Sequence, residues 1–251
     1  HAAGLVSDTP RSELVTSCFQ KMLVAWIALG FLALSSGCAS QSAQRKAEPS
    51  VRVTKLLDEW VRVREDGGSC ASGGRKYPFV DCGRVQAAIV ALGLEFPTNP
   101  EVLLVNAVIA FETHQPDQAE SYLDALLELE PSQPGAAVLR SRLALKQGNL
   151  PHALRLLKAQ LELRPDAADL REALASVYYL SGEFNAARRE LTIAERLGAP
   201  AWRIAFNRGL IEEVEGKTTE AIDYYRLTLK ENPDYKPAHS RLRGLESEQG
   251  L

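Results

Sequence analysis

The feature that most constrains the fold of this chain is a period of 34 residues in its second half. Small and apolar residues recur in register from one period to the next. The fullest columns are Ala119, Ala153, Ala187 and Ala221; Ile109, Leu143, Val177 and Ile211; Leu123, Leu157, Leu191 and Tyr225; and Ala107, Ser141, Ala175 and Gly209. Such a period is typical of a small supersecondary unit that buries its apolar face by stacking on copies of itself.

Each period divides into two halves with helical spacing, as Leu103 and Ala107, then Ala119 and Leu123, show in the first one. Two helices approach closely only where small side chains face each other, so the alanine columns predict the contact between the halves. A left-handed residue is expected to end each first helix, and this column holds His114, Gly148, Gly182 and Gly216. Prolines that cannot continue the second helix follow it at Pro131, Pro165, Pro200 and Pro233, of which Pro200 is one place late.

This combination of period, alanine, glycine and proline resembles the tetratricopeptide repeat. The resemblance implies an all-α fold, a right-handed α-solenoid of helix-turn-helix repeats. Units are predicted at 100–133, 134–167, 168–201 and 202–235, and a capping helix follows from Lys236, so that 100–251 forms four repeats plus a cap. Arg171 fits worst, because a packing residue is expected at its position.

Upstream, residues 51–99 are predicted to form a degenerate first helical pair. Its helices are expected at 51–64 and at about 83–95, because the glycine-rich stretch between them cannot form a stable helix. This stretch lies within a loop insertion that contains Cys70 and Cys82. We expect the two cysteines to form a disulfide, and the alternatives are two free thiols or a metal or redox site.

The first 37 residues are interpreted as a secretory signal peptide with a possible upstream extension. The apolar run at 23–34 is too short to cross a bilayer as a helix, which takes roughly 20 residues. It ends in LSSGC, which resembles the lipobox of bacterial lipoproteins, so Cys38 is expected to carry the lipid. Residues 38–50 would then be a lipidated N-terminus and flexible tether. The resemblance implies the periplasmic face of the outer membrane, because no aspartate follows Cys38.

The repeat resemblance also implies where partners bind. The first helices of such a solenoid line its inner groove, and proteins bind there as extended peptides or helices. The residues expected to form the partner-binding groove are Phe111, Arg142, Lys146, Glu172, Tyr179, Arg203, Phe206 and Asn207. Asn207 alone occupies a place used by the clamps that bind peptide carboxyl termini in some members, which does not make a clamp.

Charge and composition exclude other function classes. The net charge of -3 leaves no basic field for binding nucleic acid. None of the four histidines has metal-ligand spacing to another ligand type, and the acidic pair Glu212-Glu213 is interpreted as a solvated helix face, although Glu213 could face the groove. We therefore expect a cofactor-free, non-enzymatic scaffold that binds another envelope protein. The alternatives are a periplasmic enzyme or redox protein that uses the Cys70 and Cys82 loop, and a structural spacer with an empty groove.

Overall fold

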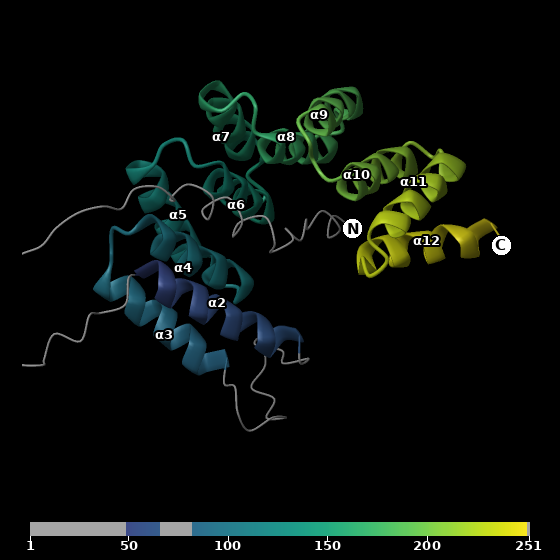
Figure 1. The fold of residues 1–251 in the computed structure, drawn as a ribbon. Helices are drawn as coiled ribbons and strands as arrows, with labels where there is room; N and C mark the ends of the chain where they lie inside the picture. The colour runs from purple at the N-terminus through teal and green to yellow at the C-terminus, as the bar shows by residue number, and fades with distance from the viewer. Residues whose placement is uncertain (1–48, 66–81, 250–251) are drawn as a thin grey trace, which may run out of the picture. The chain divides into compact units, whose positions relative to one another are not determined.

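The computed structural model describes residues 49–65 and 82–249, and in these ranges the chain is helical, without strands (Figure 1). The predicted signal peptide, most of the tether, Cys38 and Cys70 lie outside the described residues, and so does the side chain of Cys82. The helices are α2 (Pro49–Glu65), α3 (Cys82–Glu95), α4 (Pro100–Glu112), α5 (Pro116–Leu129), α6 (Pro134–Lys146), α7 (Leu150–Leu163), α8 (Ala168–Leu180), α9 (Phe184–Arg196), α10 (Ala201–Val214), α11 (Thr218–Glu231) and α12 (Lys236–Gln249). None of these helices is long and apolar enough to cross a bilayer.

The helices pack as consecutive pairs, as the 34-residue period predicts. The helices of each pair, α4 with α5 through α10 with α11, lie side by side, and each pair also contacts the first helix of the next pair (Figure 1). All four alanines of the central column are fully buried. Layers of core therefore follow one another along the solenoid. Tyr235, just before α12, and Ala238 and Leu245 of α12 complete the last layer.

The turns inside the pairs confirm the left-handed residues expected from sequence. Gly148, Gly182 and Gly216 have φ values of 75°, 76° and 76°, and His114 adopts the same conformation at 59°. After each of them, a backbone N–H reaches back to a carbonyl of the preceding helix, as from Asn149 to Ala144 at 2.8 Å. This hydrogen-bond pattern ends the first helix and reverses the chain.

The late proline at position 200 has a physical explanation. Helix α9 ends in an additional left-handed glycine, Gly198 with a φ of 90°, and the N–H of Ala199 donates to the carbonyl of Ala194 at 2.9 Å. The second helices α5, α7 and α11 end without such a glycine. Pro200 is the N-cap residue of α10, whereas Pro131, Pro165 and Pro233 each lie two residues after the end of a second helix, so Pro200 belongs to the start of the next helix.

Helices α2 and α3 lie against each other and against α4. Trp60, Val85 and Ile89 are buried between these helices and α4, in one core cluster with Val102 and Val105. Arg171, which fits the repeat pattern worst, lies on α8, where its Nη1 contacts Glu190 Oε2 of α9 at 3.0 Å. An ion pair between the two helices of the unit thus replaces the expected apolar contact.

Candidate functional site

The predicted groove residues differ in how far solvent reaches them. Lys146 is exposed, and Phe111, Arg142, Tyr179 and Asn207 are half-buried on α4, α6, α8 and α10. Three others lie in the interior, since Glu172, Arg203 and Phe206 are 5%, 8% and 3% exposed. The first helices therefore present the half-buried residues, while the buried ones connect neighbouring repeats.

Glu172 and Arg203 form a buried ion pair between α8 and α10. Arg203 Nη2 lies 2.8 Å from Glu172 Oε2, and Asn207 Nδ2 donates to Glu172 Oε1 at 3.4 Å. Burial raises the pKa of the Glu172 carboxyl above its usual value, and the guanidinium of Arg203 opposes this shift. Arg203 and Asn207, which were predicted to bind a partner, therefore contact the Glu172 carboxylate of the same chain.

Phe206 packs into the last core layer. Its ring centroid lies 5.7 Å from that of Tyr225 on α11 and 5.0 Å from that of Tyr235, whose ring is nearly perpendicular to it. Tyr235 precedes the capping helix α12, which closes over this end of the solenoid. Phe206 is therefore covered by the two tyrosine rings and shares its core cluster with Ala238 and Leu245 of α12.

A second polar cluster lies next to Phe206, around Glu213 of α10. The hydroxyl of Tyr225 donates to Glu213 Oε2, and Arg241 Nη1 of α12 donates to Glu213 Oε1 at 2.9 Å. Burial, with the hydrogen bond to Glu213, raises the pKa of Tyr225 far above its usual value. The interpretation of Glu212-Glu213 as a solvated face is wrong, because both carboxylates are paired.

Glu212 belongs to a separate ion-pair cluster at the end of α10. Arg188 of α9 donates to Glu212 Oε1 at 2.9 Å and to Glu215 Oε2 at 2.6 Å, and Lys217 contacts both carboxylates. The hydrogen bond from Arg188 lowers the pKa of Glu215 to about 2. These charges connect α9 to the end of α10 in the following pair.

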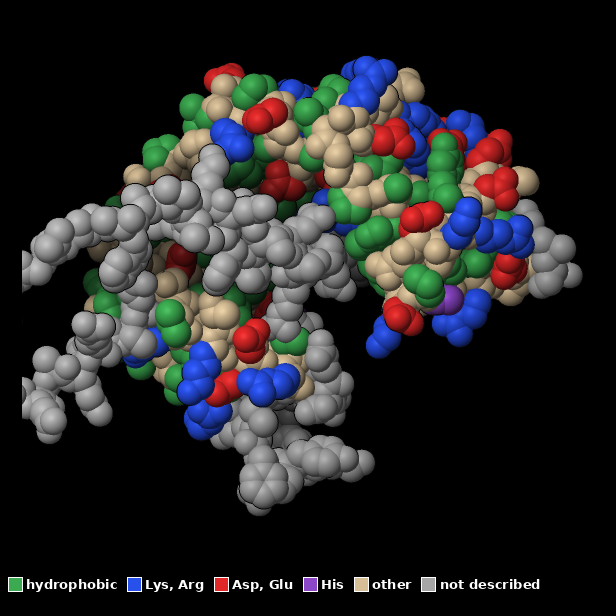
Figure 2. Space-filling view, viewed as in Figure 1, with side chains coloured by type: hydrophobic (Ala, Val, Ile, Leu, Met, Phe, Trp, Pro, Cys, Tyr) green, Lys and Arg blue, Asp and Glu red, His purple; other side chains and the backbone are tan. Residues whose placement is uncertain are grey.

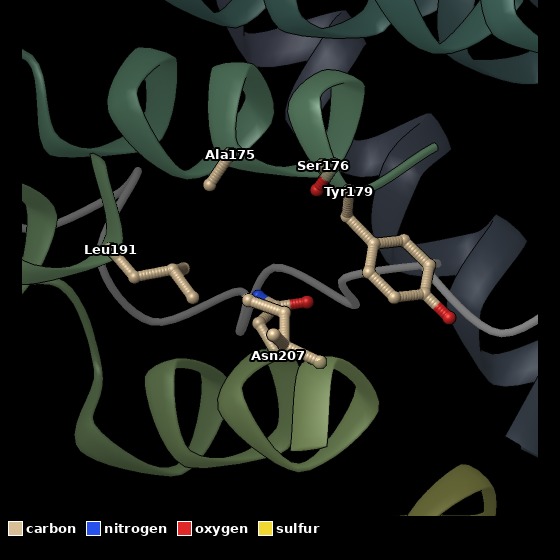
Figure 3. A pocket seen from close by; sticks show the side chains of 6 residues that line it. Ala175, Ser176, Tyr179, Leu191 and Asn207 are labelled. Carbon is tan, nitrogen blue, oxygen red and sulfur yellow. The ribbon is translucent and has the colours of Figure 1, made fainter. Parts of the chain in front are cut away.

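A small cavity separates α8 from α10 (Figure 3). Ser176 and Tyr179 project from α8 toward Asn207 on the facing helix, and Leu191 of α9 closes one side. Its volume of about 10 Å³ is room for roughly one water molecule. This part of the inner surface therefore has no hole for a partner's side chain.

The N-terminal half of the inner surface is formed by α4 and α6. Leu104, Val108 and Phe111 of α4 are half-buried, and Lys146 Nζ of α6 lies 3.8 Å from the centroid of the Phe111 ring. At its edge, Trp60 Nε1 donates to Glu112 Oε2 at 2.9 Å. These half-buried apolar side chains of α4 thus lie beside a lysine of the next repeat.

The described residues contain no group of three His, Cys, Asp or Glu side chains that could hold a metal ion. On the face that Figure 2 shows, acidic, basic and apolar side chains are interspersed over the C-terminal helices.

The sequence analysis did not predict Arg241 as a partner of Glu213. The signal was available, because Arg241 lies one period of 34 residues after Asn207, a groove position.

Comparisons with known proteins agree with this architecture. A family model described as tetratricopeptide repeat matches residues 104–168, 138–191 and 172–236, together more than half of the chain. In fold, the chain is similar to a thermophilic TPR protein of Thermus thermophilus, with a TM-score of 0.63, 20% identity, and 77% of this chain and 98% of that chain covered. A tetratricopeptide repeat protein of Parabacteroides merdae gives a TM-score of 0.63 at 16% identity, covering 77% of this chain and 70% of that one.

Two curated relatives are similar in sequence. Superkiller complex protein 3 of Homo sapiens is 31% identical over 101 residues, which is 40% of this chain and 6% of the relative. The protein of the same name from Mus musculus is 29% identical over 157 residues, 54% of this chain and 10% of the relative. The chain thus spans a tenth or less of the curated relatives that it matches.

Proposed function

Because the chain belongs to the tetratricopeptide-repeat family, whose members generally mediate protein–protein interactions, we propose that it is a non-enzymatic scaffold. In this proposal it binds a peptide or helix of a partner protein on the inner surface formed by its first helices. The observation that carries the proposal is the half-buried apolar surface of α4 and α6, formed by Leu104, Val108, Phe111 and Leu145 beside Lys146.

This surface suits a partner segment that brings apolar side chains. Half-buried aromatic and aliphatic groups on a rigid helical scaffold lose little conformational entropy on binding, and covering them removes apolar area from water. The exposed Lys146 at its edge would favour an acidic residue in the same segment. A helix with apolar residues on one face, or an extended strand with alternating ones, meets these requirements.

Recognition of a free carboxyl terminus is a poorer fit. A clamp needs several donors that become desolvated together around the ligand carboxylate. In this chain Asn207 and Arg203 already contact Glu172, so a ligand would have to displace a buried carboxylate of the protein. We therefore propose recognition of an internal partner segment through the α4 and α6 surface.

The proposed setting is the bacterial cell envelope, with the chain lipid-anchored through Cys38 at the periplasmic face of the outer membrane. The LSSGC motif after a short apolar run supports this setting. Pilus biogenesis, secretion and cell-wall enzyme regulation are examples of processes in which such a scaffold would act. Metabolic labelling with an alkyne fatty acid should mark the wild type and not Cys38→Ser. Equal labelling of both would contradict lipidation at Cys38.

Binding is tested by affinity capture from envelope membranes, followed by mass spectrometry. The double variant Val108→Asp with Phe111→Ala changes two half-buried groove positions, and Ser121→Asp places the same charge on the outer face of α5. A specific partner should be lost with the groove variant and retained with Ser121→Asp, while circular dichroism shows both to be folded. If the folded groove variant recovers the same partners as the wild type, the proposal fails.

A further inference from the structure

Helix α3 exposes an apolar face that none of its described neighbours covers. Its inward side chains, such as Val85 and Ile89, are fully buried, but on the outward side Leu94 is 81% exposed and Val90 is 38% exposed. Gly83, Gln86, Ala87 and Ala91 of α3, with Gln115 and Gln118 at the start of α5, complete the lining of an open hollow of about 480 Å³. Among the described residues, those that line this hollow carry no charge.

The other second helices of the solenoid provide an internal comparison for this face. At the places of Val90 and Leu94 in the 34-residue period, α5, α7, α9 and α11 carry polar side chains. The place of Val90 holds Asp124, Lys158, Thr192 and Arg226, and that of Leu94 holds Glu128, Glu162, Arg196 and Lys230. Since solvent is the ordinary neighbour of this face in the other repeats, the apolar version on α3 indicates that another surface covers it.

The face is complementary to itself when a second α3 packs against it in the opposite direction. Gly83 and Ala87 lie toward its N-terminal end, and Val90 and Leu94 lie toward its C-terminal end. With a two-fold axis midway between Gly83 and Leu94, Leu94 of one copy lies over Gly83 of the other, and Val90 lies over Ala87. Every protruding side chain then meets a small residue, which is the condition for close helix packing and for an isologous interface.

The helix dipoles favour the same direction of packing. The charged side chains at the ends of α3 do not select a direction, because Arg84 Nη2 pairs with Glu59 Oε2 of α2 at 2.7 Å and Arg52 Nη1 of α2 pairs with Glu95 Oε2 at 2.6 Å. Antiparallel packing opposes the dipoles of the two α3 helices, whereas parallel packing would align them.

We propose that this chain forms a symmetric homodimer through the outward face of α3, with the two copies of α3 antiparallel. The interface uses a second helix, so the partner-binding surface on the first helices α4 and α6 is not part of it. The proposal does not depend on the nature of the partner, and its tests are independent of partner capture.

Sedimentation velocity of the full chain tests the dimer. The double variant Val90→Asp with Leu94→Glu gives α3 the residues that α5 carries at these places, and Leu163→Glu on α7 is a matched control that removes another exposed leucine. We expect the wild type and Leu163→Glu to be dimers at about 100 µM, well above a Kd of about 10 µM for a small interface, and the double variant to be a folded monomer. A monomeric wild type, or a dimer that survives the double variant, would overturn the proposal.

An exchange of opposing residues tests the packing register. Ala87→Val alone would set valine against Val90 of the second copy and weaken the dimer by about tenfold or more. Adding Val90→Ala exchanges the large and small residues of the same pair and should restore the wild-type dimerisation constant within a few-fold. If the exchanged variant dimerises no better than Ala87→Val, the antiparallel register is wrong.

Discussion

Gly209→Ala tests whether the helix contacts of the solenoid are as tight as the repeat columns imply. Gly209 of α10 stands where the other units have Ala107, Ser141 and Ala175. A Cβ at this position would lie 2.6 Å from Cε1 and 2.9 Å from Cδ1 of Tyr225, whereas carbon atoms prefer about 3.5 to 4.0 Å. The ring cannot easily retreat, because it is fully buried and its hydroxyl donates to Glu213.

The expected magnitude follows from two opposing effects. Overpacking of a buried contact costs about 1 to 3 kcal/mol, and the loss should lie near the upper end because the overlap is about 1 Å. Replacing glycine by alanine inside a helix recovers about 1 kcal/mol. The net loss of about 1 to 2 kcal/mol should lower the melting temperature by about 2 to 8 °C for a chain of this size.

The assay is thermal and urea unfolding followed by circular dichroism. Gly244→Ala in α12 is the matched control, because its Cβ would meet no atom within 4 Å, and this variant should be slightly more stable than the wild type. Gly209→Ala with Tyr225→Leu restores the alanine and leucine of the other units, so the two changes should couple by about 0.5 kcal/mol or more. If Gly209→Ala is as stable as Gly244→Ala, or if the two changes are additive, the packing argument is refuted.

Three further perturbations test the core, a turn and the buried ion pair. Ala153→Leu places a larger side chain at a fully buried contact, so unfolding in urea should show a loss of about 1 to 3 kcal/mol, and an unchanged midpoint would contradict the repeat register. His114→Gly removes a side chain from a residue with a φ of 59°, so it should stabilise the chain by up to about 1 kcal/mol, whereas a loss of stability would show that the imidazole makes a contact worth more than the strain. The raised pKa of Glu172 means that the folded chain binds this proton more tightly than the unfolded chain, so the contribution of Glu172 to stability is greatest below the ordinary glutamate pKa and is lost as pH rises through the raised value. The unfolding free energy of the wild type minus that of Glu172→Gln should therefore fall with rising pH in this window, and a constant difference would contradict the direction of the shift.

The fold could be predicted from the sequence at positions where every repeat needs the same backbone conformation or the same small side chain. A residue such as Gly182 must be left-handed for the chain to reverse, and Ala187 must be small for α8 and α9 to meet, so both constraints recur with every unit. The extra turn at Gly198 was missed because it occurs at one unit boundary only. A periodic pattern predicts what all units share and contains no information on what one unit adds.

The groove could be predicted only as a set of positions. The columns identify the side of each first helix, but they do not show that Arg203 would turn inward to Glu172 or that Tyr235 would cover Phe206. Those outcomes depend on pairings between units and on the capping helix, which are specific to this chain. The sequence-based groove therefore combined partner-facing residues such as Phe111 with residues that stabilise the contacts between units.

Photo-crosslinking tests the central claim, that the first helices form the surface on which a partner binds. A benzophenone amino acid is placed at position 108, half-buried on α4, or at position 121, exposed on the second helix α5. Irradiation of envelope membranes should give a partner adduct from position 108 and none from position 121. An adduct from position 121 with none from position 108 would place the partner on the outer helices and contradict the account.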